Sequence, residues 1–224
     1  MAQKMAGTQG ISRRAMVVTG AGAAAGLLAA PGLLGAQTAP LRDHPNPMPA
    51  ELRRALERSP GLPVLGNPQG DVTLSEFFDY NCRFCRANLA DVQRLITGDK
   101  QLRVVFHEWP VFGDGSFFAA KAALAARHQN KYWQLHAALM GMRARAEEAT
   151  VMRAAREVGL DEAKLRADME KRAILDQIYE TMDLADTMML QGTPTFIAGH
   201  EAAFGKLGLG ELQKLVADAR KYKL

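Results

Sequence analysis

Residues 76–85 read Glu-Phe-Phe-Asp-Tyr-Asn-Cys-Arg-Phe-Cys and place a Cys-x-x-Cys pair, Cys82 and Cys85, directly after an apolar segment. The run 72–80 is rich in β-branched, aliphatic and aromatic residues, which predicts a buried β-strand. In the run 86–96, aliphatic residues recur at helical spacing. The two cysteines therefore lie where a strand ends and a helix begins.

This position favours redox chemistry. The N-terminus of a helix offers free backbone N–H groups and a partial positive charge, and both stabilise a thiolate relative to a thiol. We expect Cys82 to face outward and attack, and Cys85, one helical turn further on, to resolve the mixed disulfide. These are the only two cysteines of the chain.

Two other roles for the pair are weaker alternatives. A structural zinc site needs about four ligands; the pair supplies two, and the five histidines form no close pair in the sequence. A purely structural disulfide across two intervening residues would close a very small loop, where the gain in loop-closure entropy is small. We therefore predict a redox pair that uses no metal and no cofactor.

The first 39 residues have the three-part plan of an export signal. They comprise a polar stretch with Lys4, Arg13 and Arg14, an Ala/Gly-rich apolar segment at 15–34, and small residues at 35–39. The stretch 12–17 resembles the twin-arginine export motif, with Met16 in place of the usual Phe. The general secretory route and an uncleaved membrane anchor are the alternatives. We expect a protein of the periplasm, or one otherwise exported.

The charge balance argues against a nucleic-acid partner. The chain carries 28 Lys+Arg and 24 Asp+Glu, a net charge of +4. Residues 1–39 hold three of these basic residues and no acidic one, so the remainder has 25 basic against 24 acidic residues. A nearly neutral mature chain lacks the basic surface that nucleic-acid binding requires.

The chain is divided by composition and periodicity. We expect an export signal at 1–39, a Pro-rich segment with a short helix at 40–63, α/β parts at 64–114 and 191–224, and an all-helical block at 115–190. In the first α/β part, strands at 72–79 and 102–109 flank a helix, so they should be parallel with a right-handed crossover. In the second, a Pro-containing loop at 192–199 leads into a short strand, and a helix at 210–221 closes the chain.

This order of elements is that of a thioredoxin fold with an inserted all-helical domain. Two motifs at the ends of the expected elements resemble those of the DsbA family of exported thiol–disulfide oxidoreductases, in its Asp-Tyr-x-Cys-x-x-Cys branch. They are Glu76–Cys85 and Gly192-Thr193-Pro194-Thr195-Phe196. The resemblance covers about 64–222.

The resemblance implies roles for five residues. Cys82 would be the nucleophile and Cys85 the buried resolving thiol. Thr193 and Pro194 would form a cis peptide bond that faces the cysteines and presents backbone groups to an extended substrate. Glu76 would be a buried acid that assists proton transfer to or from the resolving thiol. The alternative interpretation is that Glu76 lies at a strand edge and faces solvent.

The second predicted strand contains two adjacent ionisable residues. His107 and Glu108 follow one another there, and we interpret them as a structural pair rather than as catalytic residues. An acid or an imidazole in a buried strand needs a hydrogen-bond partner or a shifted pKa.

The residues between the cysteines differ from those of DsbA itself. Arg83 and Phe84 stand here in place of Pro-His, so one donor to the thiolate is lost. Arg83 supplies positive charge, but on a flexible and solvent-screened side chain. We expect a less stabilised thiolate and a less oxidising pair than in DsbA. Isomerase-like members of the DsbA family also have a threonine before the proline, as Thr193 is here. The direction of disulfide exchange therefore stays open: the chain could be an oxidase, an isomerase or a reductase.

The expected partners are protein substrates with thiols or disulfides and a redox partner protein in the membrane; the oligomeric state is left open. The alternative function is a non-catalytic periplasmic chaperone or a metal-handling protein of the same fold. Met182, Met188 and Met189 could suggest copper binding, but their helical spacing is more typical of core residues. A glutathione-transferase-like activity disagrees with the Cys-x-x-Cys pair.

Overall fold

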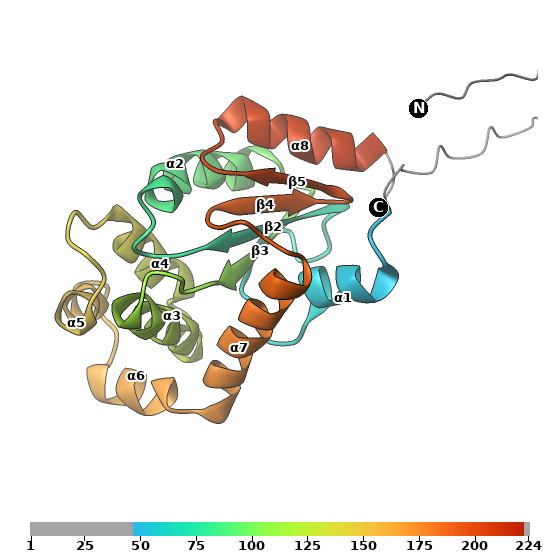
Figure 1. Cartoon of the computed structure of the whole chain (residues 1–224). Coiled ribbons are helices and arrows are strands. Elements are labelled where there is room, and N and C mark those ends of the chain that lie inside the picture. The colour runs from blue at the N-terminus through green and yellow to red at the C-terminus, as the bar shows by residue number, and fades with distance from the viewer. Residues whose placement is uncertain (1–46, 222–224) are drawn as a thin grey trace, which may run out of the picture. The chain divides into compact units, whose positions relative to one another are not determined.

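A computed structural model describes residues 47–221, which form an α/β unit built on a five-stranded sheet (Figure 1). The export signal expected at 1–39 and the beginning of the Pro-rich segment lie outside the described residues. Within the described part, the predicted order of strands and helices is observed. The short helix expected within the Pro-rich segment 40–63 is α1, Ala50–Arg58.

The sheet has the strand order β1-β3-β2-β4-β5. The strands are β1 Val64–Gly66, β2 Val72–Phe78, β3 Leu102–Glu108, β4 Thr195–Ala198 and β5 Glu201–Phe204. Strands β2 and β3 are parallel, as predicted. Strand β4 runs antiparallel to β2 and pairs with β5 in a hairpin. All residues of β2 and β3 are buried, including the polar side chains of Glu76, His107 and Glu108.

Strand β1 is an addition to the predicted fold. Val64–Gly66 pairs antiparallel with β3 and forms one edge of the sheet. Three residues are too few to produce a recognisable alternation, so sequence patterns could not reveal this strand. Gly66 ends it with a φ of 76°, and a Cβ there would lie 2.5 Å from the Leu102 carbonyl oxygen. The turn that leaves β1 therefore requires glycine at this position.

Eight α-helices occur in the described part of the chain. Besides α1 they are α2 Arg83–Gly98, α3 Asp114–Ala126, α4 Tyr132–Gly141, α5 Glu148–Glu157, α6 Glu162–Met169, α7 Arg172–Thr187 and α8 Leu209–Lys221. Helices α3 to α6 follow β3 and pack against one another, and α7 leads back to β4 (Figure 1). None of these helices is both long and apolar enough to cross a membrane.

Alternation along β2 divides the core into two layers. Phe78, like Tyr80 just beyond the strand, faces the larger cluster, which also contains both cysteines. Phe77 faces a smaller cluster with Leu56 of α1 and Trp109. Burying one such side chain contributes about 1.5–3 kcal/mol. Because residues two apart share a face, Glu76 points to the same side as the cysteines.

Candidate active site

The cysteine pair lies at the start of α2, as the sequence predicts. Cys82 is the residue that caps the helix, and the backbone N–H of Cys85 donates to its Sγ at 3.4 Å. Both are free thiols, and their exposed fractions are 3% and 1%, so Cys82 is buried and does not face outward as expected. The structure therefore shows the dithiol form with its sulfurs at a helix N-terminus.

The loop before β4 faces this pair. Because β4 pairs antiparallel with β2, residues that precede Thr195 lie beside the end of β2. The Cys82 thiol donates to the Thr193 carbonyl oxygen at 3.3 Å, and Thr193–Pro194 is the expected cis peptide bond. The Thr193 hydroxyl is buried and has no hydrogen-bond partner among the described residues. It is therefore free to donate to a thiolate at Cys82.

The surroundings of Cys82 favour its ionised form. They lower its pKa to about 6, mainly because the Cys85 thiol can donate to the thiolate, although burial opposes the shift. Thr193 and the backbone N–H groups of Cys85 and Phe84 lower this pKa further. The guanidinium of Arg83, which we expected to supply positive charge, lies over the Phe84 ring, 4.5 Å from the centroid.

The second thiol has the opposite character. Burial raises the pKa of Cys85 far above its ordinary value, and its hydrogen bond to Cys82 adds to the shift. At neutral pH the reduced pair therefore carries a thiolate at Cys82 and a thiol at Cys85. This division suits an attacking sulfur followed by a resolving one.

Glu76 lies inside the sheet rather than at a solvent-facing edge. It is 3% exposed and is paired with Phe106 of β3 and Phe196 of β4. Burial, with a smaller contribution from negative charge at Cys82, raises its pKa to about 8. Glu76 also acts electrostatically on Cys85. A neutral carboxylic acid is thus held near the resolving thiol.

His107 and Glu108 do not form the expected pair, because successive strand residues face opposite sides of the sheet. His107 stacks on Phe77 with centroids 4.2 Å apart, and its Nε2 donates to the Leu56 carbonyl oxygen at 2.9 Å. Glu108 faces the cysteine side. Tyr80 and Tyr132 donate their hydroxyl groups to its Oε1 at 2.9 and 3.0 Å. Burial raises the pKa of Glu108 well above its ordinary value.

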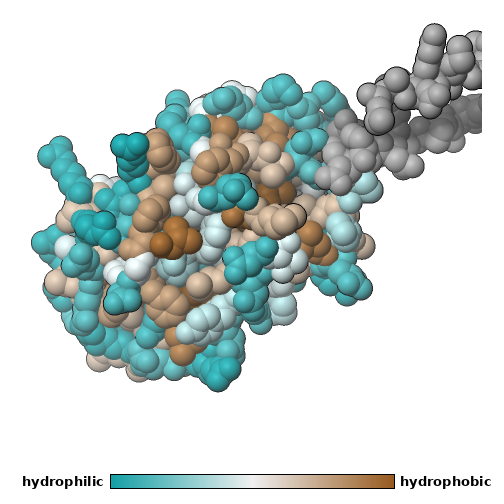
Figure 2. All heavy atoms as spheres, viewed as in Figure 1, coloured by the Kyte–Doolittle hydropathy of each residue, from teal (hydrophilic) through white to brown (hydrophobic). Residues whose placement is uncertain are grey.

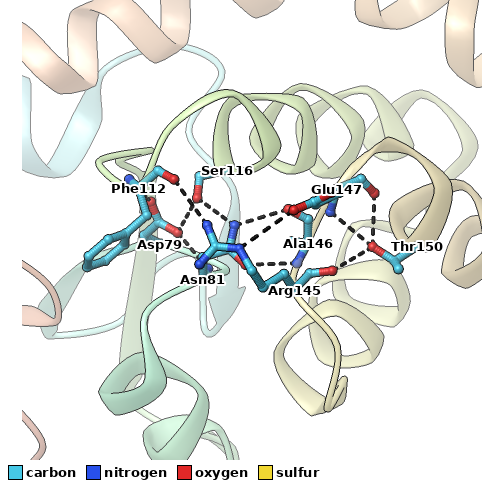
Figure 3. Close-up of polar contacts among 8 residues, drawn as sticks. All are labelled: Asp79, Asn81, Phe112, Ser116, Arg145, Ala146, Glu147 and Thr150. Atoms are coloured by element: carbon cyan, nitrogen blue, oxygen red, sulfur yellow. Dashed lines mark hydrogen bonds and ion pairs between the residues drawn. The ribbon is translucent and has the colours of Figure 1, made fainter.

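A polar network before Cys82 was not predicted from the sequence (Figure 3). The Asp79 carboxylate, 2% exposed, accepts from the backbone N–H of Asn81 at 2.6 Å and the Ser116 hydroxyl at 2.7 Å. Its second oxygen accepts from the N–H groups of Val111 and Phe112 at 2.7 and 3.0 Å. The polar residues just before the cysteine pair could have indicated a hydrogen-bonded network. Their partners lie more than thirty residues away, so the sequence spacing could not identify them.

The methionines that could suggest copper occupy different environments. Met182 and Met188 pack against the buried cluster of Leu56 and Phe77, whereas Met189 is 77% exposed. In residues 47–221, no three His, Cys, Asp or Glu side chains are grouped so as to hold a metal ion.

Comparison with known proteins links this site to thiol chemistry. Residues 73–217 match the family model of the DSBA-like thioredoxin domain. A thioredoxin-like oxidoreductase from Silicibacter pomeroyi DSS-3 is 49% identical in sequence; the match covers 75% of this chain and 98% of that chain, with a TM-score of 0.74. The thiol-disulfide exchange protein alpha-DsbA2 from Wolbachia pipientis is 26% identical over 75% of this chain and 91% of that one, with a TM-score of 0.70.

The chain is also similar to one part of some larger proteins. The Na(+)/H(+) antiporter NhaA 3 from Salinispora tropica is 27% identical over 158 residues, which are 70% of this chain and 24% of that protein. The chain therefore spans about a quarter of the length of this curated relative.

Proposed function

The chain belongs to the DSBA-like thioredoxin domain family, and from this premise we propose that it is an exported enzyme that transfers disulfides to protein thiols. The observation that carries the proposal is the unequal pair: a thiol with a pKa of about 6 at the helix N-terminus and a buried thiol with a raised pKa. The direction, the substrates and the place of action are parts of this proposal.

The reaction starts from the Cys82–Cys85 disulfide. A substrate thiolate attacks Cys82 Sγ, so a substrate–Cys82 bond forms and the bond to Cys85 breaks. Cys85 leaves as a thiolate, which its buried environment disfavours. The neutral carboxyl group of Glu76 supplies a proton to it and later regains one from solvent.

A second substrate thiolate completes the exchange. It attacks the substrate sulfur of the mixed disulfide, and Cys82 leaves as the stabilised thiolate. The substrate is oxidised by two electrons, and the enzyme is reduced to the dithiol. A redox partner, which we place in the membrane, must then remove these electrons to restore the disulfide.

The pKa of Cys82 supports oxidation as the direction. A leaving thiol with a lower pKa leaves faster, and a stabilised reduced form makes the disulfide a stronger oxidant. The pKa of about 6 lies between that of DsbA, about 3.5, and that of thioredoxin, about 7. We infer a disulfide donor weaker than DsbA, with isomerase activity as the second candidate because Thr193 precedes the proline.

The surface is compatible with unfolded protein substrates. Among the large apolar side chains, Phe84 is 44% exposed, Phe112 48% and Phe204 61%. Figure 2 shows hydrophobic residues gathered in patches among hydrophilic ones on the face that it displays. Such side chains can contact the apolar segments that an unfolded substrate exposes. We place the reaction outside the cytoplasm because of the signal-like sequence at 1–39.

A single transfer assay tests the proposal. The chain from residue 40 onward is oxidised with oxidised glutathione and mixed with a reduced, unfolded protein that contains several cysteines. We expect one disulfide to be transferred per enzyme. In a separate mixture, the reduced Cys85→Ser variant attacks an oxidised peptide through Cys82, and we expect it to accumulate a mixed disulfide of the summed mass because the resolving thiol is missing. A wild-type chain that binds the unfolded protein without transferring its disulfide would instead support the non-catalytic chaperone.

A further inference from the structure

The loop that carries Cys82 is fastened to the helical block at several points. On the loop side, Asn81 directly precedes Cys82, and Arg86 lies in the first turn of α2. On the helical side are Ser116 at the start of α3 and the connection between α4 and α5, which contains Met142 and Ala146. We call these five residues the latch. Its two halves come from distant parts of the sequence.

Asn81 makes the tightest connection (Figure 3). Its side-chain Nδ2 donates to Ser116 Oγ at 2.9 Å and to the Ala146 carbonyl oxygen at 3.0 Å. Its Oδ1 accepts from the Ala146 backbone N–H at 2.8 Å. The side-chain amide thus pairs with both backbone groups of one residue, in the manner of a neighbouring strand. This geometry fixes the residue next to Cys82 against the start of α3 and the connection between α4 and α5.

Arg86 connects the same loop to the helical block. Its Nε donates to the Tyr80 carbonyl oxygen at 2.6 Å, and its Nη1 donates to the Met142 carbonyl oxygen at 2.9 Å. The planar guanidinium therefore bridges the approach to Cys82 and the helical block, which a lysine ammonium could not do in the same geometry. Its Nη2 is buried and has no hydrogen-bond partner among the described residues.

The positive charge of Arg86 interacts with a thiolate at Cys82. The hydrogen-bond acceptors of its guanidinium are neutral carbonyl oxygens, so these contacts leave its positive charge in place. Arg86 and a thiolate at Cys82 attract each other, while Asp79 also contributes a nearby negative charge. A partly buried charge is screened less than an exposed one. Arg86 is thus better placed than the exposed Arg83 to favour the thiolate.

We propose that Asn81 and Arg86 are positioning residues for disulfide exchange, through which the helical block holds Cys82 in place and keeps a positive charge near its sulfur. The inference rests on the proposed function, because it concerns the same cysteine pair. It separates two contributions: Asn81 supplies position without charge, whereas Arg86 supplies both.

Three variants distinguish these contributions: Asn81→Ala, Arg86→Lys and Arg86→Met. The pKa of Cys82 is measured from thiolate absorbance, and the rate of exchange with glutathione is measured on folded protein. We expect Arg86→Met to raise the pKa by roughly half a unit, less than for an opposite charge in direct contact with the thiolate. Arg86→Lys and Asn81→Ala should leave the pKa nearly unchanged but slow exchange by about three- to tenfold, because the loop is no longer fastened.

Arg94→Met is the matched control, since Arg94 is an exposed arginine of the same helix that pairs only with Asp91 in the described contacts. A pKa shift in Arg86→Met no larger than in Arg94→Met, or wild-type exchange rates in both Asn81→Ala and Arg86→Lys, would overturn the inference. If Arg86→Met does not fold, the Arg86→Lys and Asn81→Ala rates decide the question. A wild type that fails to transfer disulfides to protein would refute the proposed function, while the pKa comparison would still test the latch.

Discussion

The two faces of the central sheet both bury titratable side chains, but with different consequences. On the cysteine face, Glu76 and Glu108 are buried acids whose pKa values are raised mainly by burial. On the opposite face, His107 is buried against Phe77, and burial lowers its pKa to about 4. All three groups are therefore neutral over part of the pH range in which they would ordinarily be charged.

The difference lies in what each group can do when it changes protonation state. Glu76 interacts electrostatically with both thiols, and we propose that its proton takes part in the exchange reaction. His107 is held by the Leu56 carbonyl oxygen on the face without cysteines, where it connects β3 to α1. In our proposal the same physical effect, burial of an ionisable group, supports chemistry on one face and stability on the other.

The largest expected effect tests whether the chemistry is confined to one face. Cys82→Ser should lower the rate of disulfide exchange at least a thousandfold, because the attacking sulfur is removed. The matched change on the other face, Trp109→Phe, should alter the rate less than twofold in folded protein. Exchange with glutathione, followed by mass spectrometry, measures both. Substantial exchange by Cys82→Ser would mean that the nucleophile is wrongly assigned.

The second prediction concerns His107. His107→Ala should lower the free energy of unfolding by about 2–4 kcal/mol, because it removes a stacked ring and leaves the Leu56 carbonyl oxygen without its donor. Denaturant unfolding at pH 7 measures the loss. The exchange rate per folded molecule should stay near that of the wild type. A large loss of rate without loss of stability would show that this face also takes part in the reaction.

The third prediction concerns Glu76, whose replacement should raise the free energy of unfolding, whereas replacement of His107 should lower it. A folded Glu76 with a pKa of about 8 binds a proton that the unfolded chain, with a pKa near 4.3, has lost. The wild type therefore loses stability as the pH rises from about 4.3 to 8. Glu76→Gln removes this loss and should raise the free energy of unfolding at pH 8 by about 1–3 kcal/mol.

The same variant should slow exchange about tenfold, because the proton donor for Cys85 is missing. Parallel denaturant titrations at pH 4 and pH 8 separate the effect from simple packing changes. Equal stabilisation at both pH values would contradict the raised pKa, and destabilisation at pH 8 would contradict the buried, unpaired acid.

The smallest effect concerns the second acid. Tyr132→Phe removes one of the two phenol donors to Glu108 Oε1 and leaves that of Tyr80. We expect the free energy of unfolding to fall by about 1 kcal/mol, typical of one neutral hydrogen bond. The exchange rate should change less than twofold, because Glu108 is bound to phenols rather than to a thiol. A rate loss as large as that of Glu76→Gln would assign Glu108 to the reaction.

Local patterns predicted most of the fold. The strands at the cysteine pair, their parallel pairing and the helical run before Thr195 all follow from periodicity within short windows. Strand β1 was missed because it has only three residues. The pairing of His107 with Glu108 was wrong because neighbours on a strand face opposite sides.

The site was predicted only as far as its motifs reach. Cys82, Cys85 and the Thr193–Pro194 loop belong to short motifs that can be recognised in the sequence, and Glu76 occupies a fixed place before them. Asn81 and Arg86 could not be assigned, because their partners Ser116, Met142 and Ala146 lie 35 to 65 residues away. Tertiary structure alone brings these groups together.

The central claim is that the fold activates one thiol of the pair, and a pH titration of the reduced protein tests it most directly. With a folded pKa of about 6 and an unfolded value near 8.5, Cys82 stabilises the reduced fold most above pH 8.5. This stabilisation declines as the pH falls and is lost below about 6. Thiolate absorbance, with Cys82→Ser as the blank, should titrate with a midpoint near 6. A midpoint at or above 8.5 would contradict the activated thiol and the disulfide exchange proposed for it.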